Sequence, residues 1–189
     1  MHTMDPSQLS PSARQVFKLI EFDEDEKLLF EVRKHWFGLF LVYFFGSFVI
    51  VLALAAAVGA AALPSGEFDT IRMPVVLLGL MLAILGAIFT AIGAYLYRSN
   101  VILVTSDKLA QLLVYGIFQR KISQLSIGDV QDVTVRQHGI IAHALNYGTI
   151  IIETSGEQAN YSFNFAPDPY LASKAIVGAH EENLKLHGN

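Results

Sequence analysis

The stretch WFGLFLVYFFGSFVIVLALAAAVGAAAL, residues 36–63, contains no Asp, Glu, Lys or Arg. A second charge-free stretch, PVVLLGLMLAILGAIFTAIGAYLY, covers residues 74–97. A bilayer core of about 30 Å requires roughly 20 apolar residues in a helix, and both stretches exceed that length. Because hydrocarbon offers the backbone no hydrogen-bond partners, each stretch is expected to be helical. The sequence therefore predicts two transmembrane helices, joined into a hairpin by an extracytoplasmic loop at residues 64–73.

The composition agrees with a small membrane protein. The chain has 189 residues, of which 53% are hydrophobic and 16% are charged, whereas about 25% charged residues is usual for a soluble domain. Outside the hairpin lie a head, residues 1–35, and a tail, residues 98–189, long enough for one small domain. The net charge of −4 argues against nucleic-acid binding. The absence of cysteine excludes disulfides and thiolate zinc sites.

Basic residues predict the orientation of the hairpin. Arg33 and Lys34 directly precede the first stretch and Arg98 follows the second, whereas the connecting loop contains two acidic residues and Arg72. Lys and Arg concentrate in short loops on the cytoplasmic side of a membrane. We therefore expect a multi-pass protein of the cell membrane with both termini in the cytoplasm.

Aromatic and basic residues near the hairpin ends are the expected contacts with the membrane interface. Trp and Tyr rings favour the headgroup level, where Lys and Arg also meet anionic lipid. The residues assigned to this interface are Arg33, Lys34, His35, Trp36, Tyr97, Arg98, Lys108, Arg120 and Lys121.

Small residues recur every four positions within both stretches. Such rows allow two helix backbones to approach closely in lipid. They either pack the hairpin against itself, the favoured interpretation, or leave one row for self-association. The residues of these rows are Ala53, Ala57, Ala61, Gly79, Ala83, Ala87 and Ala91. Both stretches lack the charged groups that ion pathways need, so a transporter working alone is not expected.

The head begins with a helix signal. Ser10 and Pro11 suit the cap and the first position of a short amphipathic helix. The apolar segment at residues 27–33 is compatible with a strand or with an early start of the first membrane helix, and the second interpretation is favoured.

The tail shows the alternation of period two that is typical of strands. Strands are expected within 101–104, 109–115, 117–122, 133–135, 147–154 and 161–165, followed by a helix that begins at Asp168-Pro169. Strands at such regular spacing favour a bent antiparallel sheet that protects its edges. The predicted fold class is thus an α+β membrane protein, with a helical hairpin followed by a small antiparallel barrel and a C-terminal helix.

Several motifs resemble bacterial PH-domain membrane proteins of the YdbS-like group. They are RKHW at 33–36, NVILVTSDK at 100–108, YGIFQRK at 115–121, IGDVQDV at 127–133 and LNYGTI at 145–150. The resemblance covers most of the chain from about residue 26, including the order of the two helices. It implies a pleckstrin-homology-like domain on the cytoplasmic side, and the group lends no defined biochemical activity.

Binding and catalytic signals in the tail are weak. From Arg98 onward the chain carries seven Lys or Arg residues and eight Asp or Glu residues, a net charge of −1, which predicts no polybasic attraction to anionic lipid. In phosphoinositide-binding PH domains the first strands and their loop carry basic clusters. Here residues 105–107 are expected to form that loop, with Lys108 as the single basic residue beside it. We expect no metal, because His138 and His143 are a poor metal set without neighbouring carboxylates or thiols. We also expect no catalytic residue or cofactor, because the sequence has no Gly-rich phosphate loop, no nucleophile elbow and no paired catalytic carboxylates.

Three functions remain open. The leading hypothesis is a non-enzymatic membrane-anchored module for protein interaction or assembly, with a protein partner or a second copy of the chain. A candidate partner surface is the apolar turn with Ile140, Ile141 and Leu145. The alternatives are a module that senses lipids of the inner leaflet and an accessory subunit of a transporter or secretion complex.

Overall fold

The structure is a computed structural model that describes residues 4–20, 26–64, 66, 68–154 and 160–187. The chain forms two compact units. Unit 1 combines Met1–Trp36 with Leu96–Asn189, and unit 2 is Phe37–Tyr95. Segments from both ends of the sequence therefore build one unit, and the stretch between them builds the other.

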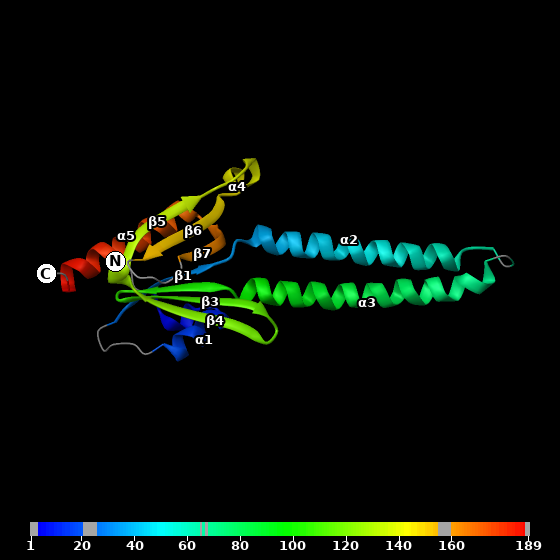
Figure 1. The fold of residues 1–189 in the computed structure, drawn as a ribbon, viewed down its shortest axis with the longest axis horizontal. Helices are drawn as coiled ribbons and strands as arrows, with labels where there is room; N and C mark the ends of the chain where they lie inside the picture. Colours follow the sequence, from blue (N-terminus) through cyan, green and yellow to red (C-terminus); the bar gives the residue numbers. More distant parts are fainter. Residues whose placement is uncertain (1–3, 21–25, 65, 67, 155–159, 188–189) are drawn as a thin grey trace. The chain divides into compact units, whose positions relative to one another are not determined.

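Unit 1 contains two antiparallel sheets. The first has the order β1-β2-β3-β4 and the second the order β5-β6-β7 (Figure 1). The strands are β1 (Leu28–Arg33), β2 (Val101–Thr105), β3 (Lys108–Gly116), β4 (Gln119–Ser126), β5 (Val130–Arg136), β6 (Tyr147–Thr154) and β7 (Tyr161–Pro167). The helices are η1 (Pro6–Gln8), α1 (Pro11–Leu19), η2 (Ile127–Asp129), α4 (Ile140–Ala144) and α5 (Pro169–His187).

The main core of unit 1 lies between the two sheets and α5. Alternate residues of β6 and β7 point into it, among them Ile150, Ile152 and Phe163, which are almost completely buried. Helix α5 contributes Ile176 and Ala179. The period of two in the sequence thus marks the inner faces of these strands, and the C-terminal helix covers the end of the fold that the strands leave open.

Helix α1 builds a second core on the other face of the first sheet. It begins at Pro11, where the Ser10 hydroxyl accepts a hydrogen bond from the amide of Ala13 at 3.2 Å. Its apolar side, with Ala13 and Val16, packs on residues of β2 and β3. Figure 1 shows α1 and the second sheet on opposite sides of the first sheet. All five residues of β2 are consequently buried.

The segment before the hairpin is a strand, which corrects the favoured interpretation of an early helix. Strand β1 pairs antiparallel with β2, from Leu28 opposite Thr105 to Arg33 opposite Val101. Leu28 belongs to the core under α1, whereas Leu29 and Val32 belong to the core between the sheets. Both faces of β1 are therefore covered, which explains why its sequence is a continuous apolar run and not an alternating one.

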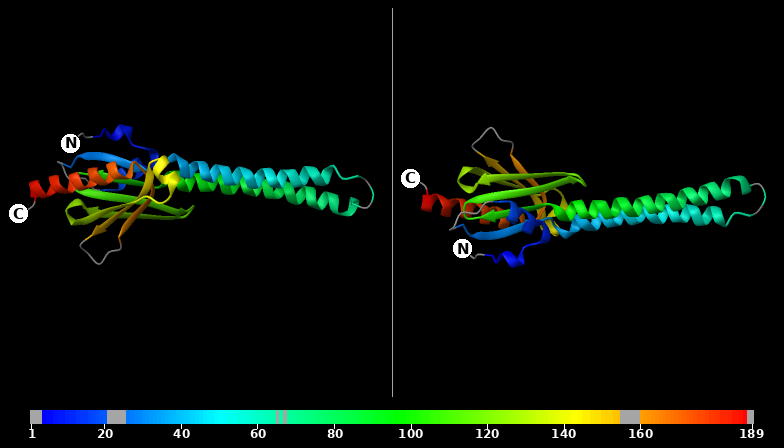
Figure 2. Two further views of the ribbon diagram at one scale, coloured as in Figure 1. Left: turned by 90° about the horizontal axis from the view of Figure 1, so that it is seen from above. Right: turned by 90° about the horizontal axis from the view of Figure 1, so that it is seen from below.

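Unit 2 is a pair of long helices that lie side by side (Figure 2). Helix α2 spans Trp36–Ala61 and helix α3 spans Asp69–Ser99, with Pro74 inside. The second helix begins at Asp69, earlier than residue 74, and an acidic side chain in the first turn favours a helix N-terminus. The Asp69 carboxylate also accepts a hydrogen bond from the amide of Gly66 at 3.0 Å. Both helices are long and apolar enough to cross a membrane, with mean hydropathies of 2.6 and 2.8.

The rows of small residues lie only partly between the two helices. Ala53, Ala57 and Ala83 are buried, and a Cβ added at Gly79 would lie 2.8 Å from the Ala53 carbonyl oxygen. The remaining members of the predicted rows are exposed on the surface of unit 2, namely Ala61, Ala87 and Ala91. The rows thus contribute to packing within the hairpin, and the second half of the α3 row faces outward.

Candidate functional site

Unit 1 has two distinct ends, which the strand register defines. The chain leaves the unit at Trp36 and returns at Leu96, so we call this the exit end. The turn at Ser106 and Asp107, between β2 and β3, lies at the opposite or distal end. The turn between β3 and β4 returns to the exit end, because the amide of Val114 donates a hydrogen bond to the Asn100 side chain at 2.6 Å.

At the exit end, His35 joins segments that are far apart in the sequence. Its amide donates a hydrogen bond to the carbonyl oxygen of Phe165 at 2.6 Å, and the Tyr97 hydroxyl donates one to the His35 carbonyl oxygen at 2.7 Å. The His35 ring lies 5.4 Å from the ring of Tyr147, which stacks on Phe165 at 5.1 Å. His35, just after the end of β1, thereby connects this strand to the end of α3 and to β6 and β7.

The backbone around His35 is unusual. Asn146, Phe165 and Asp168 all have positive φ angles, of 52°, 57° and 41°. Asparagine and aspartate tolerate this left-handed region better than most residues. The amide of Asp168 bonds to the carbonyl oxygen of Asn146 at 3.0 Å, and the two side chains also form a hydrogen bond. The segment before β6 and the segment after β7 lie at the same end of this antiparallel pair, where Tyr147 is opposite Pro167, and they support each other beside His35.

Two groups at the exit end are less readily protonated than usual. Burial lowers the pKa of the His35 imidazole, although Asp168 and the hydrogen bond to the Leu145 backbone act in the opposite direction. Burial also lowers the pKa of Lys34, whose ammonium lies 5.1 Å from the centre of the Tyr97 ring. The neutral form of His35 is thus favoured within unit 1.

Large apolar side chains project from two turns at the exit end. In the turn between β3 and β4, Phe118 is 96% exposed and Ile117 is also exposed, as is Tyr115 near the end of β3. In α4, Ile140 is 88% exposed and Ile141 is exposed as well. The sequence predicted the α4 residues, although Leu145 is half-buried. It missed the first turn, whose signal was two bulky apolar residues after Gly116, where a hairpin turn is normally polar.

Most of the predicted interface residues lie at the exit end. Arg33, directly before Lys34, is paired with the first residue of β2, and Arg98 lies in the last turn of α3. Arg120 and Lys121 follow the exposed turn on β4 and are themselves exposed. Trp36 is 60% exposed, whereas His35 is buried. Arg136, at the end of β5, joins this group and was missed because only the sheet register brings it there.

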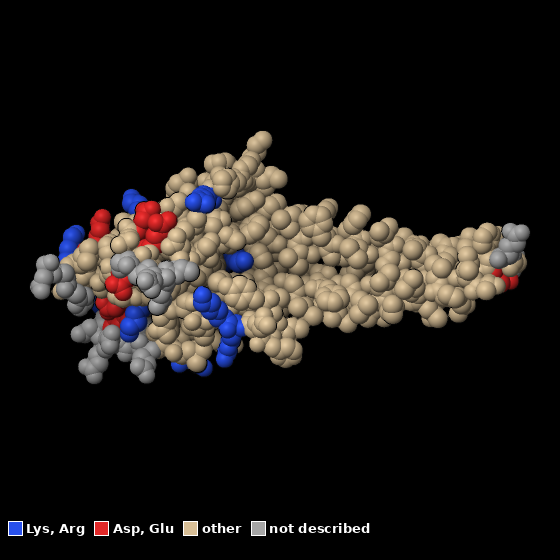
Figure 3. All heavy atoms as spheres, in the orientation of Figure 1, with Lys and Arg blue, Asp and Glu red and all other residues tan. Residues whose placement is uncertain are grey.

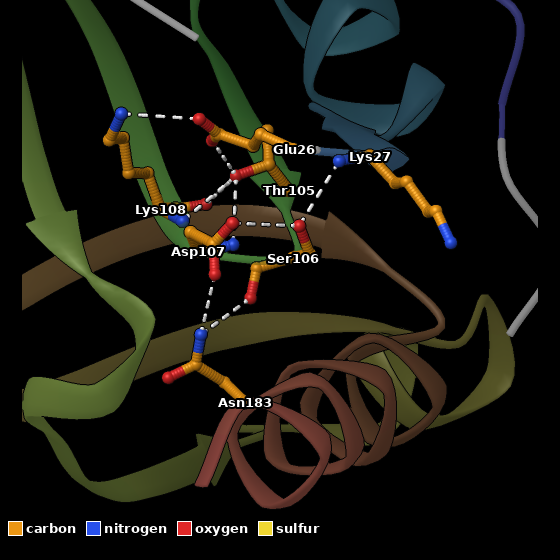
Figure 4. Close-up of polar contacts among 7 residues, drawn as sticks. All are labelled: Glu26, Lys27, Thr105, Ser106, Asp107, Lys108 and Asn183. Carbon is orange, nitrogen blue, oxygen red and sulfur yellow. Dashed lines mark hydrogen bonds and ion pairs between the residues drawn. The ribbon is translucent and has the colours of Figure 1, made fainter. Parts of the chain in front are cut away.

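Lys108 is separated from that group. It lies at the distal end, where its ammonium is 3.1 Å from the carboxylate of Glu26, a side chain with no exposed surface. The Thr105 hydroxyl donates to the same carboxylate. The Asn183 amide of α5 donates to the Ser106 carbonyl oxygen at 3.0 Å and to Asp107 at 2.7 Å (Figure 4). Lys108 therefore belongs to a polar cluster that ties the N-terminal segment and α5 to the β2–β3 turn.

A groove of about 610 Å³ lies between the first sheet and β7. It is lined by polar and aromatic side chains, including Gln111, Tyr115, Lys121, Ser123, Asn160 and Ser162. The Gln111 amide, which is almost fully buried, donates to the Ser162 carbonyl oxygen at 2.9 Å and connects the two sheets across its floor. Since β4 and β7 are edge strands of their sheets, the groove is bordered by backbone as well as side chains.

No triad of potential metal ligands is found where the structure describes the chain: in those ranges no group of three or more His, Asp or Glu residues lies together. His138 and His143 lie around α4, outside any such group. In the described part of the chain, the groove, the apolar turns and the basic residues of the exit end offer surfaces for binding.

Comparison with known families agrees with this architecture. The sequence profile described as the bacterial PH domain matches residues 39–171, which is more than half of the chain. The chain belongs to the bacterial PH domain family. It also resembles a crystal structure described as a DUF1696 family protein with a pleckstrin-homology domain from Shewanella loihica PV-4. That likeness covers 43% of this chain and 70% of the other at 12% identity, with a TM-score of 0.35. The curated proteins contain no match.

The register of this PH domain corrects the position of its first loop. Residues 105–107 connect β2 to β3 at the distal end and not β1 to β2. The connection between β1 and β2 is the whole helical hairpin. Because residues 105–107 are not the loop between the first two strands, the single Lys108 beside them does not show whether that loop is basic.

Proposed function

We propose that this chain is a non-enzymatic PH-domain protein of the cell membrane, and that its domain is an interaction or assembly module at the cytoplasmic face. The observation that carries the proposal is the position of the hairpin between two paired strands. Because β1 and β2 are neighbours in one sheet, both ends of the hairpin are fixed to the domain. Such a double attachment holds the domain near the bilayer far more closely than one linker would.

The physical basis of the anchor is the surface of unit 2. Helix α2 has 26 residues and α3 has 31, so each is longer than the roughly 20 residues that cross a bilayer. Their exposed side chains are mainly apolar, for example Phe45, Phe48 and Phe89. A surface of this kind is costly in water and favourable in lipid. Arg33, Lys34 and Arg98 at the ends of the hairpin support a cytoplasmic position for unit 1.

The groove beside β7 is the part of unit 1 best suited to a protein partner. An extended segment can bind along an edge strand through backbone hydrogen bonds, while pockets beside it select side chains. Tyr115 and Lys121 offer an aromatic surface and a charge in this groove. The partner is either another membrane-associated protein or a second copy of the chain, and an accessory role in a larger complex is one form of this function.

The orientation can be tested with single cysteines, because the natural chain has none. Phe68→Cys lies in the connecting loop and Leu186→Cys near the end of α5. A membrane-impermeant maleimide added to sealed spheroplasts is expected to label the cysteine at residue 68 but not the one at residue 186. After permeabilisation, the cysteine at residue 186 should also be labelled. Labelling of residue 186 in sealed spheroplasts, or recovery of the chain in the aqueous fraction, would contradict the anchoring.

The interaction role is tested by photo-crosslinking from the groove in living cells. A photoreactive residue at Ser123 is expected to give discrete higher-mass products, whereas one at the exposed residue Glu182, away from the groove, serves as the matched control. Only monomer at both positions would argue against a protein partner at the groove.

A further inference from the structure

Charge in unit 1 is separated between its two ends, although the net charge of the tail is close to neutral. Acidic residues gather at the distal end, namely Glu26, Asp107, Asp129, Asp132, Glu153, Glu181 and Glu182, together with the basic residues Lys27, Lys108 and Lys185. The charged residues Asp5, Arg14, Lys18 and Lys174 lie before or on helices α1 and α5 and are counted with neither end. The basic residues of the exit end are Arg33, Lys34, Arg98, Arg120, Lys121 and Arg136. On the face drawn in Figure 3, the acidic side chains of unit 1 lie toward the end that carries the C-terminus.

The carboxylates of the exit end do not cancel this basic group. Those in the described part of this end are Glu31 and Asp168. Glu31 lies 3.2 Å from the Arg33 guanidinium and accepts a hydrogen bond from the amide of Ser10 at 2.9 Å. Asp168 is hydrogen-bonded to Asn146. Both are therefore engaged within unit 1, and the exposed Arg98, Arg120, Lys121 and Arg136 give the exit end a positive surface.

Exposed apolar side chains occur at the same end. Phe118 at the tip of the β3–β4 turn and Ile140 at the start of α4 are the two most exposed large apolar residues described in unit 1. They come from connections within different sheets, and Arg120 and Arg136 are two and four residues away in the sequence, respectively. Bulky apolar residues next to Arg and Lys are the combination that binds the surface of an anionic bilayer, because the rings enter the interface while the cations meet lipid phosphates.

Chain connectivity brings this surface to a bilayer. The chain leaves unit 1 at Trp36 and returns at Leu96, both at the exit end. If unit 2 crosses the membrane as proposed above, these two positions lie at its surface. The exposed Trp36 ring has the amphipathic character of residues that settle at this level. The basic and apolar surface is thus held at the interface by the two chain connections.

We propose that the exit end of unit 1 binds the anionic lipid surface of the bilayer that holds the hairpin, with Phe118 and Ile140 entering the interface and Arg120, Lys121 and Arg136 contacting headgroups. This binding fixes the domain on the membrane and leaves the acidic distal end toward the cytoplasm. The inference rests on the proposed anchoring, and it specifies what the domain itself touches.

The test uses the full chain in nanodiscs and an environment-sensitive dye on single cysteines. Phe118→Cys and Ile140→Cys report the two turns, and Leu186→Cys is the control, since Leu186 is 70% exposed but lies near the distal end of α5. In phosphatidylglycerol discs that contain spin-labelled lipid, we expect a blue-shifted emission and strong quenching at residues 118 and 140, but not at residue 186.

The contribution of charge to lipid binding is tested separately from the closeness of the two turns to the bilayer. In discs of phosphatidylcholine, and in the variant Arg120→Glu/Lys121→Glu, the quenching at residue 118 is expected to fall toward that of residue 186. Quenching that is unchanged in both would overturn the role of anionic lipid. If Phe118→Cys disturbs the turn, Arg120→Glu/Lys121→Glu is combined with Ile140→Cys instead. The loss of quenching is then measured at residue 140, in a different element.

The outcomes separate this inference from the anchoring on which it rests. Failure of the chain to enter the discs would overturn the anchoring. Entry into the discs with equal, weak quenching at residues 118, 140 and 186 would overturn the lipid contact alone. A dye that is shielded at residue 118 in native membranes but not in pure lipid discs would also overturn it, in favour of a protein at this surface.

Discussion

Arg33 lies opposite Val101 in the β1–β2 ladder, although the entire helical hairpin separates them in the sequence. The PH domain is therefore discontinuous, and its first strand precedes the hairpin. All five residues of β2 are buried, partly under β1 and α1. A tail that begins at residue 98 would leave one edge and one face of β2 uncovered.

We predict that the isolated segment 98–189 does not fold cooperatively. In contrast, a chain that joins residues 1–36 directly to 96–189 through a short Gly-Ser linker should fold, because it retains all of unit 1, including α1, β1 and the register of the first sheet. Thermal unfolding followed by circular dichroism and amide exchange distinguishes the two. A cooperative transition of the isolated segment, equal to that of the linked chain, would show that β1 is dispensable.

The second prediction concerns packing inside the hairpin. In Gly79→Ala the new Cβ would lie 2.8 Å from both the Ala53 carbonyl oxygen and the Ala57 Cβ. Backbone must then shift, and we expect a loss of about 1–3 kcal/mol in the free energy of unfolding. Stability of the full chain in mixed micelles, titrated with sodium dodecyl sulfate, measures this loss.

Gly59→Ala is the matched control for that substitution, since a Cβ at Gly59 has no neighbour within 4 Å. Its expected effect is neutral or stabilising by up to about 1 kcal/mol, because alanine favours the helix over glycine. Equal destabilisation by both substitutions would contradict the close approach of α2 and α3 at Gly79.

The extent to which the sequence predicts the fold differs between elements for physical reasons. The hairpin and the strands after residue 100 follow from local patterns, namely charge-free runs and alternation. Strand β1 does not, because α1 covers one face and the main core the other, so Leu28 and Leu29 are buried on opposite sides. Its partner lies beyond the hairpin, where no local signal indicates a pairing.

The candidate surface was only partly predictable for a related reason. Arg33, Arg98 and Arg120 were assigned to the interface from their positions next to the hairpin or within a motif. The separation of charge depends on the strand register, which places Arg136 at one end and Lys108 at the other. The net charge of the tail combines the basic exit end with the acidic distal end, so it does not reveal that the exit end is basic.

A third prediction follows from the lowered pKa of His35. An unfolded histidine has a pKa of about 6.5, so below that pH the unfolded state binds more protons at this position than the folded state. The stability that neutral His35 provides is therefore fully present above pH of about 6.5 and is lost as the pH falls toward the lower pKa of the folded state. Unfolding of unit 1 should become easier across this window.

Urea unfolding of the linked chain between pH 8 and pH 5 measures the effect. His35→Gln should be less stable at pH 8 but should show a shallower loss of stability on acidification. His143→Gln, on the exposed side of α4, is the matched control for a histidine-to-glutamine substitution. An unchanged slope in His35→Gln would assign the acid sensitivity to other groups.

The last prediction concerns the ion pair of the distal end. Glu26 has no exposed surface, and its carboxylate lies 3.1 Å from the Lys108 ammonium. Removing the cation in Lys108→Met leaves a buried carboxylate with less compensation, so we expect a loss of about 1–3 kcal/mol in the free energy of unfolding.

Adding Glu26→Gln removes the buried charge while a side-chain oxygen remains to accept from Thr105. The double variant should therefore be more stable than Lys108→Met alone, and a double-mutant cycle measures the coupling. Additive losses would show that the two side chains do not stabilise each other.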